Sequence, residues 1–467
     1  MPATALQRRM TSMDASFLYF EKPSLPLHIG STLILEEGLD LETLTSHIES
    51  RLRRIPRYRE IAAFDPLNIA HPRWEDDPRF DVRRHLEEVY LPEGAGEPEL
   101  LDTVARLHAQ MLPRDRPLWK MIAIQGLPGG RTAVTSLVHH CMVDGVSGIE
   151  LLTAICDLTA DTPADAIEPF EPEREPTPLD RARDAWRAAA RDSAERIADA
   201  LRWGLSPQQQ ADDLKAVVGA LTAAAPQLAQ PAPMTPFNRP VSRQRAYAYM
   251  AMPFLELRGV RGVLGGTVND VVLSVLAGGL GAYLRANGHR TAGVTLRCMV
   301  PVNVRSEADK AALGNQVSMF IAPLPIGIED AAQRHQAVIG GMGRLKDANQ
   351  AGGFALLSRL SEQVPPYIQA AAGFLAPNAQ PLFNTICTNV PGPQIPLYLA
   401  GRQVEAHWPL VPLSSGLGLN FCLTSYNGVL YWGIVADPML VPDVANVAQH
   451  LGAAFEALKA AAMAAAV

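Results

Sequence analysis

The chain is poor in cysteine and lacks a long apolar run. Its 467 residues include five cysteines, an odd number without Cys-x-x-Cys spacing, so neither a disulfide framework nor a zinc site is indicated. The most apolar stretch, from Val271 to Leu284, is shorter than the about 18 to 20 residues that a membrane span needs. The first residues lack the continuous apolar segment of a secretory signal. These absences favour a protein of the reducing cytoplasm.

The sequence also lacks an excess of positive charge and two familiar catalytic motifs. A formal net charge of -7 and a pI near 5.9 argue against a nucleic-acid-binding surface, because phosphate binding depends on clustered Lys and Arg. No Gly-x-x-x-x-Gly-Lys-Ser/Thr loop occurs, and the run from Gly145 to Gly148 does not have the Gly-x-Ser-x-Gly spacing of hydrolases. Phosphate-loop and serine-hydrolase chemistry are therefore not expected.

Both halves of the chain show alternating strand and helix patterns. With 48% hydrophobic residues, the chain can bury a large core and divide into two domains. In the first half, residues 28–35 predict a strand, and helical spacing of apolar residues after Asp40 predicts a helix. The second half repeats the pattern, with expected strands at 246–252 and 294–304, a helix at 268–286 and a hairpin around Asn427-Gly428.

Two proline-rich stretches, residues 162–178 and 226–240, separate the halves. Between them an apolar stripe predicts a long connecting helix that lies against one or both domains; it comprises Trp186, Ala190, Ala194, Ile197 and Leu201. We therefore expect a mixed α/β (α+β) fold with an N-terminal domain at 1–160, a crossover linker at 161–240 and a C-terminal domain at 241–467.

A histidine-rich run follows the apolar, β-branched stretch 132–138; it reads His139-His140-Cys141-Met142-Val143-Asp144-Gly145. Successive side chains of a strand point to opposite faces, so one histidine is the chemical candidate and the other its support. An imidazole titrates near neutrality and can take a proton from an alcohol. Gly145 suits a turn that needs positive φ. A buried structural His pair is the alternative, and a metal site is disfavoured because adjacent strand histidines diverge.

The spacing His-His-x-x-x-Asp-Gly is the signature of the CoA-dependent acyltransferase superfamily. Five more motifs accompany it in order: Met13-Asp14-Ala15-Ser16-Phe17, Pro117-Leu118-Trp119, Asn269-Asp270-Val271-Val272-Leu273, Leu313-Gly314-Asn315-Gln316 and Asn389-Val390-Pro391-Gly392-Pro393. With these motifs the chain resembles the bacterial wax ester synthase/diacylglycerol acyltransferase family over essentially its whole length. It departs from the family pattern at Ser274, where alanine is usual.

The resemblance implies two chloramphenicol acetyltransferase-like domains with a tunnel between them. It also implies transfer of a long-chain acyl group from acyl-CoA to diacylglycerol, a long-chain alcohol or both. His140, as the second motif histidine, would be the general base, with no acyl-enzyme, no metal and no cofactor beyond the acyl-CoA substrate. The apolar products imply that the protein, which we expect in the cytoplasm, makes peripheral contact with the inner membrane face or lipid droplets.

The remaining candidate residues carry structural and chemical interpretations side by side. Asp144 is read either as the orienting acid of a triad or as a structural partner of an arginine, and the resemblance favours the structural role, with Arg305 as a candidate partner. Asp270 can cap a helix that begins after Thr267, whereas the amide of Asn269 can stabilise negative charge on the thioester oxygen. The other predicted tunnel, substrate-binding or structural residues are Gly145, Pro117, Leu118, Trp119, Asn315 and Gln316, and His139 supports the base.

Two other functions remain open. A condensation-type acyltransferase would use carrier-protein thioesters and would need a basic docking patch for the carrier. A catalytically silent acyl-lipid binding protein would keep the fold without turnover.

Overall fold

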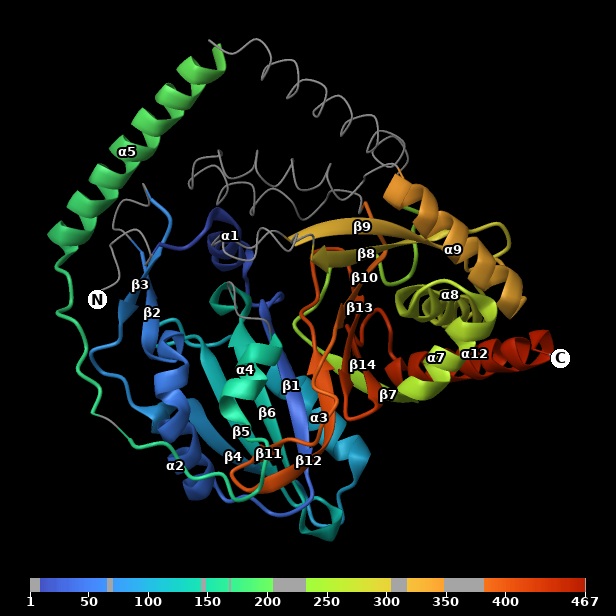
Figure 1. Cartoon of the computed structure of the whole chain (residues 1–467), viewed down its shortest axis with the longest axis horizontal. Coiled ribbons are helices and arrows are strands. Elements are labelled where there is room, and N and C mark those ends of the chain that lie inside the picture. Colours follow the sequence, from blue (N-terminus) through green and yellow to red (C-terminus); the bar gives the residue numbers. More distant parts are fainter. Residues whose placement is uncertain are drawn as a thin grey trace.

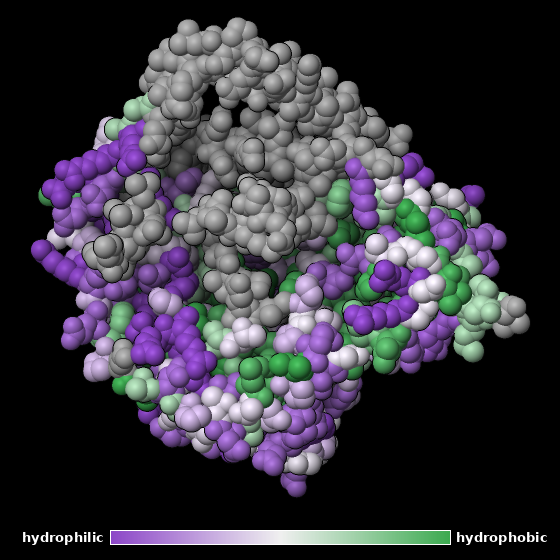
Figure 2. Space-filling view, viewed as in Figure 1, coloured by the Kyte–Doolittle hydropathy of each residue, from purple (hydrophilic) through white to green (hydrophobic). Residues whose placement is uncertain are grey.

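Two mixed α/β bodies, each built around a six-stranded sheet, make up the computed structural model of the chain (Figure 1). The structure describes residues 9–64, 70–143, 148–167, 169–204, 232–303, 317–347 and 382–466. On the face shown in Figure 2, hydrophobic residues gather between the two bodies, whereas the outer rim of the N-terminal body is mainly hydrophilic.

The N-terminal body contains a sheet of order β11-β12-β1-β6-β5-β4. Its strands are β1 (His28–Leu35), β4 (Leu86–Tyr90), β5 (Trp119–Gln125), β6 (Thr132–His139), β11 (Tyr398–Leu399) and β12 (Arg402–Leu410). Its helices are α1 (Ser12–Phe20), α2 (Leu41–Arg51), α3 (Glu97–His108) and α4 (Gly148–Ile155), with a small sheet of β2 (Glu60–Ala63) and β3 (Arg73–Asp76). Short 3-10 helices η1 to η5 span Leu52–Arg54, Pro56–Arg59, Val82–His85, Pro128–Gly130 and His140–Met142.

The C-terminal body contains a sheet of order β7-β14-β13-β10-β8-β9. Its strands are β7 (Ala246–Pro253), β8 (Leu296–Asn303), β9 (Val317–Leu324), β10 (Thr385–Val390), β13 (Leu419–Tyr426) and β14 (Val429–Ala436). The helices beside it are α7 (Phe254–Leu264), α8 (Val268–Ala286), α9 (Ala331–Asp347) and α12 (Val444–Ala465). Helix α8 is almost wholly buried from Asp270 to Leu284, which explains its apolar sequence. Among the described helices none alone has the length and hydropathy of a membrane span, and α7 with α8 meets that test only as a pair bent by 96°.

The two sheets do not divide at one point in the sequence. Strand β12 comes from the second half of the chain but pairs with β1 of the N-terminal sheet, from Gly30 opposite Leu410 to Leu35 opposite Val404. Strand β12 also lies against β14, where a Cβ on Gly433 would come 1.9 Å from the carbonyl oxygen of Pro409. The linker at 161–240 therefore does not separate the domains completely. Residues 398–410, which form β11 and β12, follow the linker in sequence but belong to the N-terminal sheet, so the two bodies share this segment.

Local patterns place most of these elements correctly. The strand at 28–35 and the helix at 268–286 have the expected bounds, and Asp40 caps α2 by accepting the N–H of Thr43. The expected hairpin joins β13 to β14, with Asn427 at φ 45° and Gly428 at φ 80°, as its tight turn requires.

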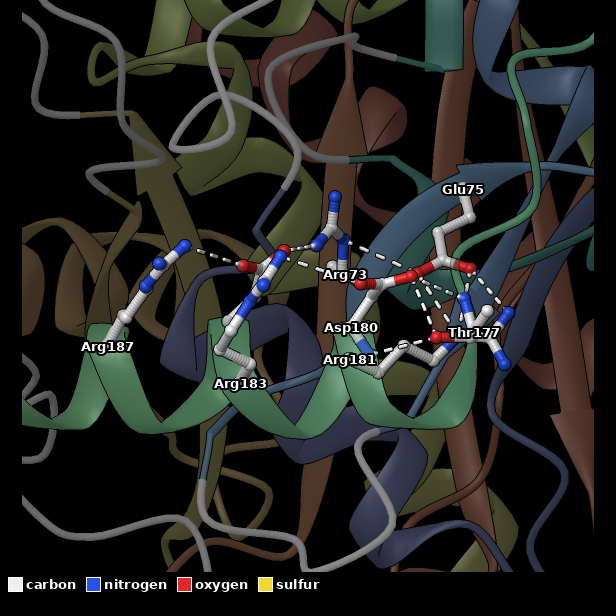
Figure 3. A network of polar contacts seen from close by, with 8 residues as sticks. Arg73, Glu75, Thr177, Asp180, Arg181, Arg183 and Arg187 are labelled. Carbon is white, nitrogen blue, oxygen red and sulfur yellow. Dashed lines mark hydrogen bonds and ion pairs between the residues drawn. The ribbon is translucent and has the colours of Figure 1, made fainter.

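The expected connecting helix is α5 (Pro178–Gly204), and its first turns are fixed to β3 by ion pairs (Figure 3). Arg181 lies 2.7 Å from Glu75, and Arg73 lies 3.2 Å from Asp184. The expectation that the apolar stripe packs against a domain is wrong at Trp186, whose side chain is 62% exposed. The ion pairs in its first turns hold α5 against the N-terminal body, so this contact does not depend on the apolar stripe.

Candidate active site

The two motif histidines lie at the junction of β6 and η5. Strand β6 ends at His139, and His140 opens the 3-10 turn, so the expectation that both rings lie on one strand is wrong. Backbone hydrogen bonds hold the junction: the N–H of His139 donates to Leu118 and that of His140 donates to Leu27, each at 2.9 Å.

His139 is a fully buried side chain whose two ring nitrogens both have neighbours. Its Nδ1 accepts the backbone N–H of Cys141 at 3.2 Å and lies 2.9 Å from the Sγ of the same residue. Burial raises the pKa of the Cys141 thiol well above its usual range, so the sulfur keeps its proton and donates. With Nδ1 acting as an acceptor, the ring proton belongs on Nε2, which lies 3.3 Å from Oε1 of Glu21.

His140 is partly buried and stacks on a ring from α1. Its centroid lies 3.9 Å from that of Phe17, with 14° between the planes. Burial lowers the pKa of His140 to about 4. The imidazole of His140 is therefore neutral at pH 7 and can accept a proton.

Glu21 is a residue near the histidine turn that the sequence analysis missed. Its carboxylate accepts the N–H of Leu27 at 3.0 Å and a guanidinium N–H of Arg114 at 2.9 Å, in addition to its contact with His139. Burial alone would raise the pKa of Glu21, but the interactions with His139, Leu27 and Arg114 lower it to about 2. No spacing rule connects residues 21 and 139, because they meet only when α1 folds against η5.

A second pair of histidines lies behind the turn. His28 stands opposite His139 in the pairing of β1 with β6, and its Nε2 lies 2.9 Å from the carbonyl oxygen of His108. The rings of His28 and His108 meet edge to face at 4.9 Å. Burial lowers the pKa of His28 to about 4 and that of His108 well below its usual value, so both rings are neutral supports at pH 7.

The segment Pro117-Leu118-Trp119 supports the turn from β5. All three residues are buried, and Leu118 accepts the backbone N–H of His139. The indole of Trp119 stacks between the rings of Tyr58 and His85, each with a centroid distance of 4.4 Å. In this structure the segment packs and positions the end of β6.

In the C-terminal body, Asn269 and Asp270 begin helix α8. Asp270 and Thr267 form the expected capping box, with Asp270 accepting the N–H of Thr267 at 2.8 Å and donating its own N–H at 3.2 Å. Asn269 is exposed, and its Oδ1 accepts the amide of Asn389 at 2.7 Å. The structure thus brings two sequence motifs together at this end of α8 and leaves the Asn269 amide N–H groups as donors.

Four predicted residues, Asp144, Gly145, Asn315 and Gln316, lie outside the described residues, as does Arg305. Their assigned roles remain predictions. Within the ranges that the structure describes, no group of three or more His, Cys, Asp or Glu side chains is arranged to hold a metal ion.

Comparison with known proteins connects this geometry to a family. Residues 10–272 match the wax ester synthase/diacylglycerol acyltransferase catalytic domain, and residues 313–459 match the C-terminal domain of the same family. A Mycobacterium tuberculosis protein named as a diacylglycerol O-acyltransferase is 33% identical over 482 residues, which cover 98% of this chain and 91% of that protein. The chain belongs to the wax ester synthase/diacylglycerol acyltransferase family. A second M. tuberculosis protein of that name is 30% identical over 446 residues, covering 95% of this chain and 94% of its own length.

Solved structures confirm the mixed α/β, two-domain fold expected for a wax ester synthase/diacylglycerol acyltransferase. The enzyme of that name from Marinobacter aquaeolei VT8 superposes with a TM-score of 0.69 at 23% identity, covering 97% of this chain and 99% of its own. The first condensation domain of the calcium-dependent antibiotic synthetase has a TM-score of 0.58 at 17% identity, with 96% of each chain covered. At these identities the likeness concerns the fold alone.

Proposed function

We propose that this chain is an acyl-CoA-dependent O-acyltransferase that forms triacylglycerol or wax ester. The donor would be a long-chain acyl-CoA and the acceptor diacylglycerol, a long-chain alcohol or both. The observation that carries the proposal is the neutral, partly buried imidazole of His140 at the end of β6, in a chain that matches the family along its length.

In the proposed reaction His140 takes the proton of the acceptor hydroxyl while the oxygen attacks the thioester carbonyl. The carbon–sulfur bond then breaks, and the imidazolium returns the proton to the CoA sulfur. His139 is unsuited to this role, because its Nδ1 is occupied by Cys141 and its Nε2 faces a carboxylate. The amide of Asn269 is the proposed donor to the thioester oxygen.

The product of this reaction has almost no polar surface. It must leave the protein into a lipid phase, since its transfer into water is unfavourable. We therefore include in the proposal a peripheral contact with the inner membrane face or a lipid droplet.

The test is thiol release from palmitoyl-CoA by purified protein with diacylglycerol or hexadecanol as acceptor. His140→Ala should lower the rate by about 10²- to 10⁴-fold, the usual contribution of a general base. His289→Ala is a matched control, because His289 is exposed in the turn after α8. A folded wild-type protein that is silent with both acceptors would contradict the proposal and favour carrier-protein thioesters or binding alone.

A further inference from the structure

We propose that Glu21 is the positioning residue for the catalytic base, holding His139 through its ring and His140 through the backbone of Leu27. This inference rests on the proposed function, since it assigns Glu21 a part in that reaction. Glu21 acts on the base through its neighbours His139 and Leu27.

The carboxylate of Glu21 lies close to nitrogen atoms from three separate parts of the N-terminal body and accepts hydrogen bonds from two of them. Its side chain is only 1% exposed. Oε1 accepts the N–H of Leu27 at 3.0 Å and also lies 3.3 Å from Nε2 of His139. Oε2 accepts a guanidinium N–H of Arg114 at 2.9 Å. One acidic group thus connects the segment before β1, the end of β6 and the loop before β5.

The same residue restrains His140 along a second route. Leu27 donates its N–H to Glu21, and its carbonyl accepts the N–H of His140 at 2.9 Å. Glu21 is also the C-cap of α1, the helix that lays Phe17 on the His140 ring. Removing the carboxylate therefore releases the ring of His139 and, through Leu27, the backbone of His140.

The chemistry of the contacts requires a carboxylate at this position. An ionised carboxylate only accepts hydrogen bonds, which suits a group that donors approach from every side. A glutamine would present its NH₂ either to Arg114 or to Leu27 and His139, so one donor would always face another. An unmatched buried polar group is costly, and the turn would shift to relieve it.

Kinetics of Glu21→Gln supply the first test. We expect kcat to fall by about 10- to 100-fold, since a base displaced by 1 Å can lose about 100-fold in rate. KM should stay within about twofold, because the contacts of this buried carboxylate are with protein groups. Glu21→Asp keeps the charge and should recover part of the loss. Glu42→Gln is the matched control, because Glu42 pairs with Arg83 at the surface and should behave as wild type.

Two kinetic results would overturn the inference. One is a folded Glu21→Gln protein whose kcat lies within about twofold of wild type. The other is a loss of rate that the unfolded fraction, measured by circular dichroism, accounts for completely.

A second measurement needs no turnover. In protein labelled with ¹⁵N-histidine, the ring signals of His139, assigned with His139→Gln, should show a protonated Nε2 and an unprotonated Nδ1. Glu21→Gln should shift the ¹⁵N signal of the protonated Nε2, because the carboxylate that faces this N–H is lost, while Nδ1, which Cys141 holds as an acceptor, stays unprotonated. Glu42→Gln should leave the Nε2 signal in place. An unchanged Nε2 signal in Glu21→Gln refutes the hold on His139 whether or not the wild type is active. A shifted Nε2 signal, found together with an inactive wild type, supports the hold and refutes only the proposed function.

Discussion

His139 and His140 are neighbours in the chain but face different surroundings, because β6 ends between them. Nδ1 of the first ring accepts the N–H of Cys141 and its Nε2 faces the Glu21 carboxylate at 3.3 Å, whereas the second ring stacks on Phe17 and stays partly accessible. A base must have one free nitrogen lone pair and a pKa that keeps it neutral. Among the described residues of the turn, His140 alone combines these properties with a partly accessible ring.

The depressed pKa of His140 gives the reaction a specific pH dependence. The neutral ring is the active form, so the rate should be lost only as pH falls through the folded-state pKa of about 4. We expect kcat/KM for acyl transfer to remain flat from about pH 8 to about pH 5. The measurement is initial CoA release at constant ionic strength, with recovery checked after return to pH 7.5. A reversible loss of kcat/KM centred near pH 6.5 would show that burial does not depress this pKa.

At the scale of elements, the shared strand β12 joins the two bodies. Gly433 on β14 allows close approach, because a Cβ there would lie 1.9 Å from the oxygen of Pro409 on β12. The hydroxyl of Tyr247 on β7 donates to the same oxygen at 3.0 Å. The contact between the C-terminal sheet and β12 therefore depends on glycine, which has no Cβ, at position 433.

Gly433→Ala should push β14 away from β12 and destabilise the protein by about 1 to 3 kcal/mol, the usual cost of overpacking. Gly343→Ala is the control, since α9 has open space around Gly343 and alanine favours a helix by about 1 kcal/mol. Urea denaturation followed by circular dichroism compares the two variants with wild type. Equal midpoints for Gly433→Ala and wild type would show that the strands separate without cost.

The elements also show what the sequence can and cannot predict. The helix at 268–286 and the hairpin at Asn427-Gly428 follow from apolar spacing and turn chemistry, which are local. The pairing of β12 with β1 and the contact of Glu21 with His139 join distant segments, so no local pattern indicates them. The motif resemblance found both histidines and the Asn269 segment, but their neighbours became visible only in the fold.

On the scale of the whole molecule, burial has left several histidines neutral in both the sheet interior and the junction between the bodies. His28 in β1 and His407 in the shared strand β12 both have pKa values lowered to about 4 by burial. The unfolded chain binds protons at these histidines near pH 6.5, whereas the folded protein does so only near pH 4. Between these values the unfolded state binds more protons, so lowering the pH must favour unfolding.

The free energy of unfolding should therefore fall as pH drops from 7 to 5, by about 2 kcal/mol for each of these two histidines at pH 5. That is a large share of the about 5 to 15 kcal/mol that stabilises a typical domain. His407→Phe should reduce the dependence, because its ring meets Tyr426 edge to face and Nδ1 has no hydrogen-bond partner within the described ranges. Thermal unfolding at pH 7.5, 6 and 5 is the measurement for both proteins. Wild-type midpoints that do not fall with pH would contradict the prediction for both histidines. A His407→Phe variant that follows wild type would show that His407 gains its proton equally in the folded and unfolded states.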